Sequence, residues 1–107
     1  MADERSVISE AFQTFLKEAP QQAQAWGAMV QGLSTASALD PKTSALAYLA
    51  VLAALGLESG IPYHALAARK AGASREEVIG AILTGLPAAG HRVTLALPAA
   101  LAAYDSQ

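Results

Sequence analysis

Apolar side chains recur every three or four residues along most of this chain, which is the spacing of an amphipathic α-helix. The first such stretch runs from Ser6 to Lys17, and Ser6 itself is a candidate N-cap. A second stretch runs from about Gln21 to Leu33, and Pro20 either ends the first helix or opens the second. The polar run Ser34 to Ser37 then predicts a loop.

The most apolar part of the chain follows an Asp40-Pro41 pair, which is a strong helix start. An aspartate accepts hydrogen bonds from the first free N–H groups of a helix, and proline fits the first helical position. The predicted helix runs to about Leu57, and beyond Ser44 it is apolar on nearly every face. We therefore expect it to be buried all round, at the centre of a helical bundle.

Glycine and proline divide the second half of the chain. Gly56 to Gly60 predicts a break, and Pro62 restarts a helix that runs through Ala71, with Gly72 as the residue just after its end. Ser74 and Glu77 then have the spacing of a capping box, which opens a helix through Leu86.

A last helix is expected from about His91 to Tyr104, and Pro98 should kink or split it. No stretch alternates between apolar and polar residues as a half-buried strand would. The predicted fold is therefore all-α, a bundle of about six helices forming one domain over residues 1–107.

Composition narrows the class of protein. Apolar residues make up 53% of the 107 residues, but many are alanines, and only 15% of the chain is charged. This balance indicates close helix packing and some apolar surface covered by other subunits. A net charge of −2 without a basic tract argues against nucleic-acid binding and against a basic membrane-surface helix.

Two absences in the sequence bear on chemistry and location. The chain has no cysteine, which excludes disulfides, thiolate catalysis and cysteine–metal sites. The longest near-apolar run that we identify, Ala45 to Leu57, is too short to span a bilayer, and the polar N-terminus does not resemble a signal peptide. We expect a cytoplasmic protein without a membrane partner.

The densest group of ionisable residues beside a core element surrounds His64. Pro62 places His64 in the first turn of a helix, where unpaired N–H groups favour a neutral imidazole. Glu58 in the preceding loop could reach it, and Tyr63 adds a hydroxyl. A His–Glu pair suits acid–base catalysis. The residues alone leave open that His64 only bonds the nearby backbone and that Glu58 is solvated.

Three more residues are candidates for holding a substrate. His91 begins the last predicted helix and would join His64 if the two helix starts converge. Arg69 and Arg92 could each grip a carboxylate through two N–H groups, although surface solvation is the better explanation of each arginine alone. Two histidines and a glutamate could also bind zinc or iron, but no pair has the compact spacing of a metal motif, so no metal is predicted.

Residues 39–43 (Leu-Asp-Pro-Lys-Thr) and residues 64–78 (His-Ala-Leu-Ala-Ala-Arg-Lys-Ala-Gly-Ala-Ser-Arg-Glu-Glu-Val) resemble the carboxymuconolactone decarboxylase family, which includes the AhpD-like alkylhydroperoxidases. The resemblance covers residues 39–104. It implies an all-helical domain that assembles as a homotrimer or homohexamer.

The resemblance separates two branches of chemistry. In the peroxidase branch, a Cys-x-x-Cys pair precedes the shared histidine. Those positions correspond here to Leu57 and Gly60, and that branch's glutamate corresponds to Ala45. Thiol peroxidase chemistry needs a thiolate, so this chain cannot perform it. The decarboxylase branch has a Gly-x-Glu before the histidine, similar to Gly56 and Glu58 here.

What the resemblance implies is cofactor-free acid–base chemistry on a small, anionic, lactone-type substrate. His64 would supply a proton and Glu58 would orient it. The chemistry, and not a motif match, suggests that Arg69 or Arg92 would hold an acid group. Two alternatives remain open from the sequence. One is a family member that carries out another reaction or only binds a small molecule, and the other is an oligomeric scaffold without catalysis.

Overall fold

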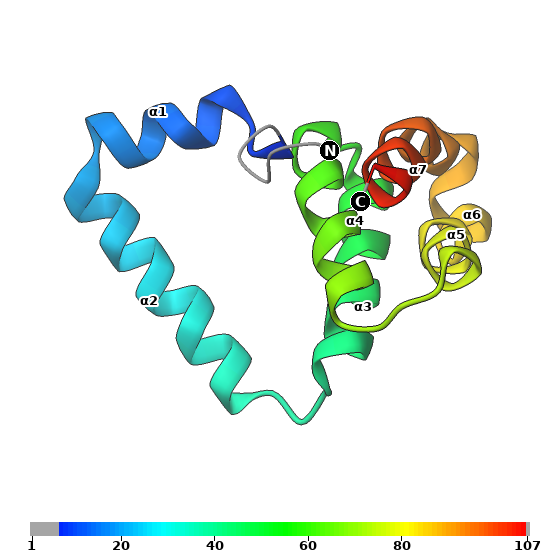
Figure 1. The fold of residues 1–107 in the computed structure, drawn as a ribbon, viewed down its shortest axis with the longest axis horizontal. Coiled ribbons are helices and arrows are strands. Elements are labelled where there is room, and N and C mark those ends of the chain that lie inside the picture. The colour runs from blue at the N-terminus through cyan, green and yellow to red at the C-terminus, as the bar shows by residue number, and fades with distance from the viewer. Residues whose placement is uncertain (1–6, 107) are drawn as a thin grey trace.

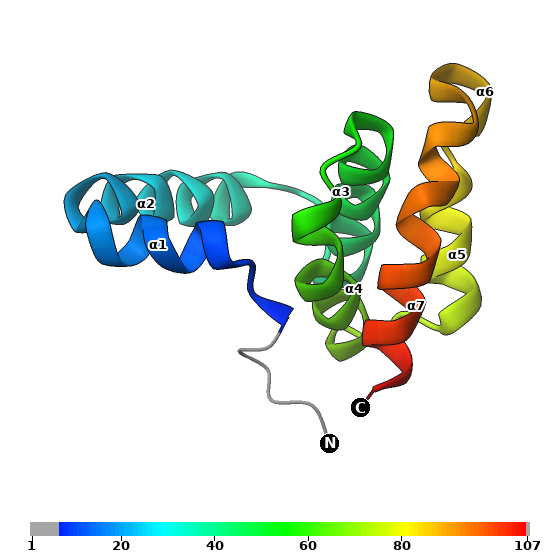
Figure 2. The same ribbon diagram turned by 90° about the horizontal axis from the view of Figure 1, so that it is seen from above.

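The computed structural model describes residues 7–106, and within them the chain is helical with no strand. The elements in chain order are α1 (Glu10–Glu18), α2 (Pro20–Ala36), α3 (Pro41–Leu55), the 3-10 segment η2 (Glu58–Gly60), α4 (Ile61–Lys70), α5 (Arg75–Leu83), α6 (Leu86–Ala89), the 3-10 segment η3 (Gly90–Ala96) and α7 (Leu97–Asp105). Helices α1 and α2 form an arm that stands to one side of a layer formed by α3 and α4, and α5 to α7 lie on the other side of this layer (Figures 1 and 2).

Two predicted helix starts are confirmed by their caps. The Asp40 side chain accepts from the backbone N–H of Thr43 at 2.7 Å. Ser74 and Glu77 form both hydrogen bonds of the capping box. The first helix begins later than predicted, because the hydroxyl of Ser9 accepts from Phe12 N–H at 3.1 Å and so caps α1. The predicted cap, Ser6, lies outside the described residues.

Glycines end α3 and α4 in the same way. Gly56 and Gly72 have positive φ angles of 72° and 100°, which a residue without a Cβ adopts freely. In α4 the N–H of Gly72 donates to Arg69 and that of Ala73 to Ala68, the two bonds of a Schellman motif. The same pair at Gly56 ends α3 at Leu55, two residues before the predicted end.

Other segments also differ from their predicted boundaries. Helix α5 ends at Leu83, three residues before the predicted end at Leu86. Helix α2 continues to Ala36 through most of the predicted loop, because no glycine or proline interrupts the chain between Gly32 and Pro41. The predicted last helix is split, as expected. A 3-10 segment runs to Ala96, and Pro98 lies in the first turn of α7, where its missing N–H costs nothing.

The core lies between α3, α4, α5, η3 and α7. Alanines outnumber the larger side chains in it, so the helices approach closely. The largest fully buried side chains are Leu49, Ile61, Val78, Ile82 and Val93.

The prediction that α3 is buried all round is wrong. Tyr48, Val51 and Leu55 on one face of the helix are 46%, 49% and 58% exposed. An apolar sequence shows that a face can be buried, but it does not show whether the same chain supplies the cover.

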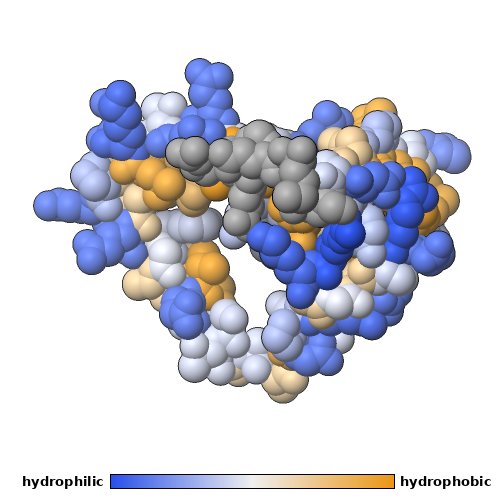
Figure 3. All heavy atoms as spheres, in the orientation of Figure 1, coloured by the Kyte–Doolittle hydropathy of each residue, from blue (hydrophilic) through white to orange (hydrophobic). Residues whose placement is uncertain are grey.

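Within residues 7–106, the ribbon of the arm meets the rest of the chain at the ends of the arm (Figure 1). The space-filling view shows an opening between the arm and the core (Figure 3). Between the two helices of the arm, Trp26 packs edge-on against Phe12 and Phe15, with ring centroids 5.2 and 6.4 Å away. Trp26 therefore makes an aromatic packing contact within the arm, and it remains 42% exposed.

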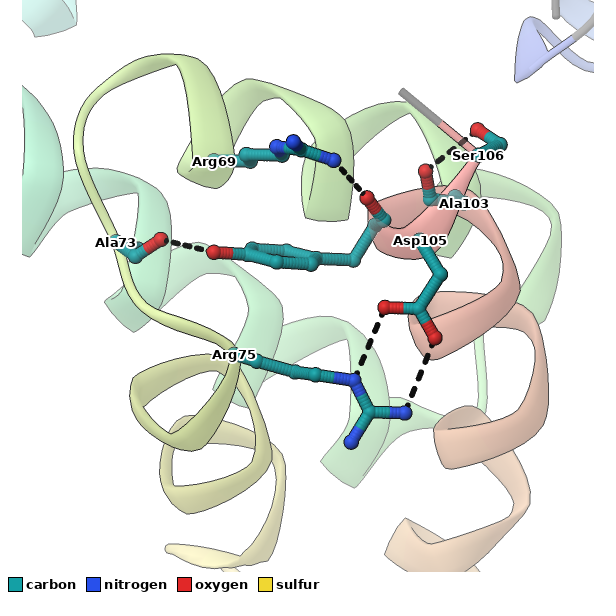
Figure 4. A network of polar contacts seen from close by, with 7 residues as sticks. Arg69, Ala73, Arg75, Ala103, Asp105 and Ser106 are labelled. Carbon is teal, nitrogen blue, oxygen red and sulfur yellow. Dashed lines mark hydrogen bonds and ion pairs between the residues drawn. The ribbon is translucent and has the colours of Figure 1, made fainter. Parts of the chain in front are cut away.

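Residues Arg75–Asp105 form a helical run that is long and apolar enough to cross a membrane by length and composition alone. This run folds back on itself at α6, so that α5 and α7 lie side by side (Figure 2). Its two ends meet in an ion pair, with Arg75 Nε 3.0 Å from Asp105 Oδ1 (Figure 4). The run is therefore part of the packed bundle.

Replacing Gly56 by alanine should destabilise the protein by about 1–2 kcal/mol, the cost of a left-handed conformation for a residue with a Cβ. The added Cβ would also clash with Arg92 Nη2 and displace that side chain. Urea unfolding measures the change. Gly80→Ala is the matched control, because Gly80 lies in α5 with nothing within 4 Å of an added Cβ, and this variant should be neutral or stabilising. Equal losses of unfolding free energy in both variants would show that the left-handed conformation of Gly56 is not the cause.

Acid should weaken the link between α5 and α7. The hydrogen bonds and charge of Arg75 lower the pKa of Asp105 below its ordinary 3.8. A carboxyl whose pKa is lowered by folding stabilises the protein above its ordinary pKa, and this contribution is lost as the pH falls through the folded value. We expect Asp105→Asn and Arg75→Gln each to lower the melting temperature at pH 6 and to flatten its fall between pH 4 and pH 2. Melting curves as steep in acid as those of the unsubstituted chain would argue against this link.

Candidate functional site

His64 lies near the start of α4, where two tyrosines flank its ring. The ring centroid of Tyr48, from α3, is 4.5 Å from that of His64, and the centroid of Tyr63 is 5.0 Å away. The preceding residues fix the position of the helix start, because Ile61 is fully buried and Pro62 occupies the first turn. The imidazole is half-buried at the edge of the α3–α4 layer.

The imidazole of His64 is held in its neutral form near pH 7. Burial of the ring lowers its pKa below the ordinary 6.5. The sequence also predicted a neutral imidazole, but from the positive potential of a helix start. The physical cause in the structure is desolvation by burial of the imidazole. A neutral imidazole can accept one proton and return it, which is what a general acid–base residue does.

The structure does not pair Glu58 with His64. Glu58 is exposed at the start of η2, and among residues 7–106 no hydrogen bond or ion pair joins it to the imidazole. The two residues are nevertheless close along the chain, because η2 leads directly into α4. A Glu58 that orients His64 would need a side-chain movement, which an exposed position allows.

The two candidate arginines have structural partners. Arg69 donates to the backbone carbonyl of Tyr104, and its guanidinium lies 5.0 Å from the centre of the Tyr104 ring (Figure 4). Arg92 donates to the carbonyl of Leu55 at 3.2 Å, at the C-terminal end of α3. Arg69 thus joins α4 to α7, and Arg92 supports the loop that carries Glu58.

His91 is exposed on η3, where its backbone carbonyl accepts from the hydroxyl of Thr94 at 2.7 Å. Among the described residues, no contact joins its side chain to His64. In the same part of the chain, no three His, Asp or Glu side chains lie close enough together to hold a metal ion.

Tyr48 is the site residue that sequence reasoning missed. It is the only aromatic residue between Pro41 and Leu57, in a helix predicted to be buried on all sides. A tyrosine in such a helix needs a partner or solvent for its hydroxyl, which is a signal that it lies at an edge. The pattern could not show that its neighbour would be His64, from a different helix.

The surface beside the site is shallow. A hollow of about 330 Å³ runs along α4 from Tyr63 to Lys70, with Leu66, Ala67 and Ala71 in its wall. His64 does not line this hollow. A wider hollow of about 530 Å³ lies between α3 and α5, and the Lys42–Glu77 ion pair borders it.

Comparison with known protein families decides the identity of the domain. The model of the carboxymuconolactone decarboxylase family matches residues 20–103, most of the chain. This protein belongs to the carboxymuconolactone decarboxylase family. Comparisons with curated proteins and with solved structures gave no match.

Family membership confirms the resemblance noted in the sequence and extends it toward the N-terminus. The match begins at Pro20, so α2 is part of the family domain although it stands away from the core. At the position of the second family cysteine, a Cβ built on Gly60 would lie 3.7 Å from His64 Cδ2. The loop geometry therefore places position 60 against the histidine, but glycine brings no chemistry to it.

Removing the Tyr48 ring should raise the pKa of His64 toward 6.5, because burial is what lowers it. Proton NMR of the histidine ring resonances in Tyr48→Ala measures the shift. Tyr48→Phe keeps the ring and should leave the His64 titration unchanged. An unaltered titration in Tyr48→Ala would mean that another group shields the imidazole.

Proposed function

We propose that this member of the carboxymuconolactone decarboxylase family is a cofactor-free decarboxylase acting on a small carboxylated lactone. The observation that carries the proposal is the half-buried, neutral His64 between two tyrosines in a domain of this family. The absence of cysteine in the sequence removes the thiol chemistry of the other branch.

The proposed reaction needs one proton and no redox partner. The carbon–carbon bond to the carboxylate breaks, CO₂ leaves, and its bonding electron pair is delocalised toward the lactone carbonyl. A proton then replaces CO₂ at carbon. His64 takes this proton from solvent and, as the imidazolium, delivers it to the carbon.

The residues around His64 have proposed supporting roles. Tyr63 and Tyr48 would place their hydroxyls beside the substrate, and Glu58 would orient the protonated imidazole after a rotation of its side chain. Arg92, next to the Glu58 loop, is the better placed of the two arginines to hold a carboxylate. Arg69 is the weaker candidate because Tyr104 already engages its guanidinium. His91 would contribute only at the margin of the site.

The separation of Glu58 from His64 favours a second function in which the same surface only binds a small acid. An enzyme that relied on the pair would gain from a preformed hydrogen bond, although such bonds often tighten only when substrate binds. For both functions we expect the protein in the cytoplasm, acting on a soluble anion and not on nucleic acid or membrane.

Decarboxylation of carboxymuconolactone by the purified protein, followed as loss of substrate and release of CO₂, tests the proposal. Removing the proton donor in His64→Ala should lower turnover by about 10²–10⁴-fold. His91→Ala is the matched control, because it removes the other histidine from an exposed position, and it should keep most of the activity. The masses of all three proteins in solution must agree.

Equal background rates in the protein and in His64→Ala would overturn the decarboxylase proposal. The binding function then predicts that small carboxylic acids raise the melting temperature, by an amount set by ligand concentration and affinity. Loss of this shift in Tyr63→Ala would place the ligand beside the tyrosines.

A further inference from the structure

Helix α2 is exposed along most of its length and carries no charged residue. Within the 17 residues of Pro20–Ala36, only Ala23 is buried. Its apolar stripe follows helical spacing through Trp26, Val30 and Leu33, with Met29 beside it, and all four side chains are at least 40% exposed. A solvent-facing helix usually has charged residues, whereas charge is depleted at the centre of protein interfaces.

The second uncovered apolar surface is on α3. Tyr48, Val51 and Leu55 form a stripe at i, i+3 and i+7, and the sequence from Ala45 to Leu57 has no charge. This stripe passes through the candidate site, because Tyr48 is the ring that packs on His64. A surface that covers the α3 stripe at Tyr48 would therefore lie beside the imidazole.

These two surfaces do not meet within one chain. In Figures 1 and 2 the arm stands off from the α3–α4 layer, and Figure 3 shows an opening between them. Strongly hydrophobic atoms of the arm border this opening. One chain thus carries both apolar stripes but holds them apart. In a pair of copies, the α2 stripe of one copy can cover the α3 stripe of the other.

The exposed area is large enough for such a contact. The chain exposes 6772 Å², whereas a compact monomer of this mass exposes about 5,600 Å². The excess of about 1,200 Å² exceeds the ~800 Å² per partner that a standard stable interface buries. The Cα radius of gyration of 14.0 Å is likewise above the ~13 Å of a compact domain of this length.

We propose that the arm of a second copy packs its α2 stripe on the Tyr48 face of α3, and that this contact closes the His64 site. A single chain would then hold an incomplete site, in which the imidazole lies at an open edge. The assembled site would be a walled one, with apolar residues of the second copy excluding water from the substrate. The inference concerns the surface, and it does not depend on the reaction proposed above.

The first test is the mass in solution, by sedimentation equilibrium at tens of micromolar protein. The unsubstituted chain should have at least twice the 10.9 kDa mass of one chain. Val30→Glu on the arm and Val51→Glu on α3 each place a charge at the contact and should reduce the mass to that of one chain. Gln24→Glu adds the same charge to the opposite side of α2 and should leave the assembly intact.

The second test uses the only tryptophan of the chain, Trp26. Covering by a second copy should shift its emission to shorter wavelength and protect it from acrylamide, in the unsubstituted chain and in Gln24→Glu alike. In Val51→Glu the tryptophan should become quenchable, although the substituted residue lies on a different helix. Circular dichroism checks that helix content is unchanged, and Leu33→Glu replaces Val30→Glu if that variant loses helix.

The third test reports on the site without measuring turnover. His64 should titrate at lower pH in the assembly than in Val30→Glu, because a second copy deepens the burial of the ring. A single-chain mass for the unsubstituted protein, or an unchanged mass in both Val30→Glu and Val51→Glu, would overturn the proposal. A lower mass with an unchanged His64 titration would overturn the closing of the site. None of these outcomes depends on whether the decarboxylase proposal holds.

Discussion

The close packing of α4 between α3 and α7 is the contact on which the rest of the structure depends. Ala65 and Ala68 on α4 are fully buried, as is Ala100 on α7, so the helix backbones can approach closely. Arg69 strengthens the same junction by donating to the Tyr104 carbonyl, and the Tyr104 hydroxyl donates to the carbonyl of Ala73 at 2.7 Å. These contacts set the axis of α4 and thereby the position of His64 at its start.

Close packing through alanines reduces the apolar area that the core buries. Alanines make up more than half of the buried apolar residues, and each contributes little compared with leucine or isoleucine. The larger apolar side chains lie disproportionately outside the core, on α2 and on the outer face of α3. A domain built in this way gains much of its remaining hydrophobic stabilisation only when another surface covers these residues.

The candidate site also depends on burial among apolar neighbours. The neutral state of His64 arises from apolar and aromatic neighbours, because no charged partner contacts it in the described part of the chain. The arginines and Glu58, which carry the charges nearby, either support the backbone or face solvent. Acid–base chemistry here would therefore depend on how completely the ring is shielded from water.

The sequence by itself determined the helical class, the family and most helix boundaries, because caps, prolines and positive-φ glycines are local signals that act within a few residues. Asp40, the Ser74–Glu77 box, Gly72 and Pro98 all behave as their types predict. Family resemblance also singled out His64. The tertiary structure alone decided that Tyr48 flanks His64, that Tyr104 engages Arg69 and that one face of α3 is left open. Each of these depends on how helices distant in the sequence pack together, and apolar periodicity shows which face is to be buried without showing which surface covers it.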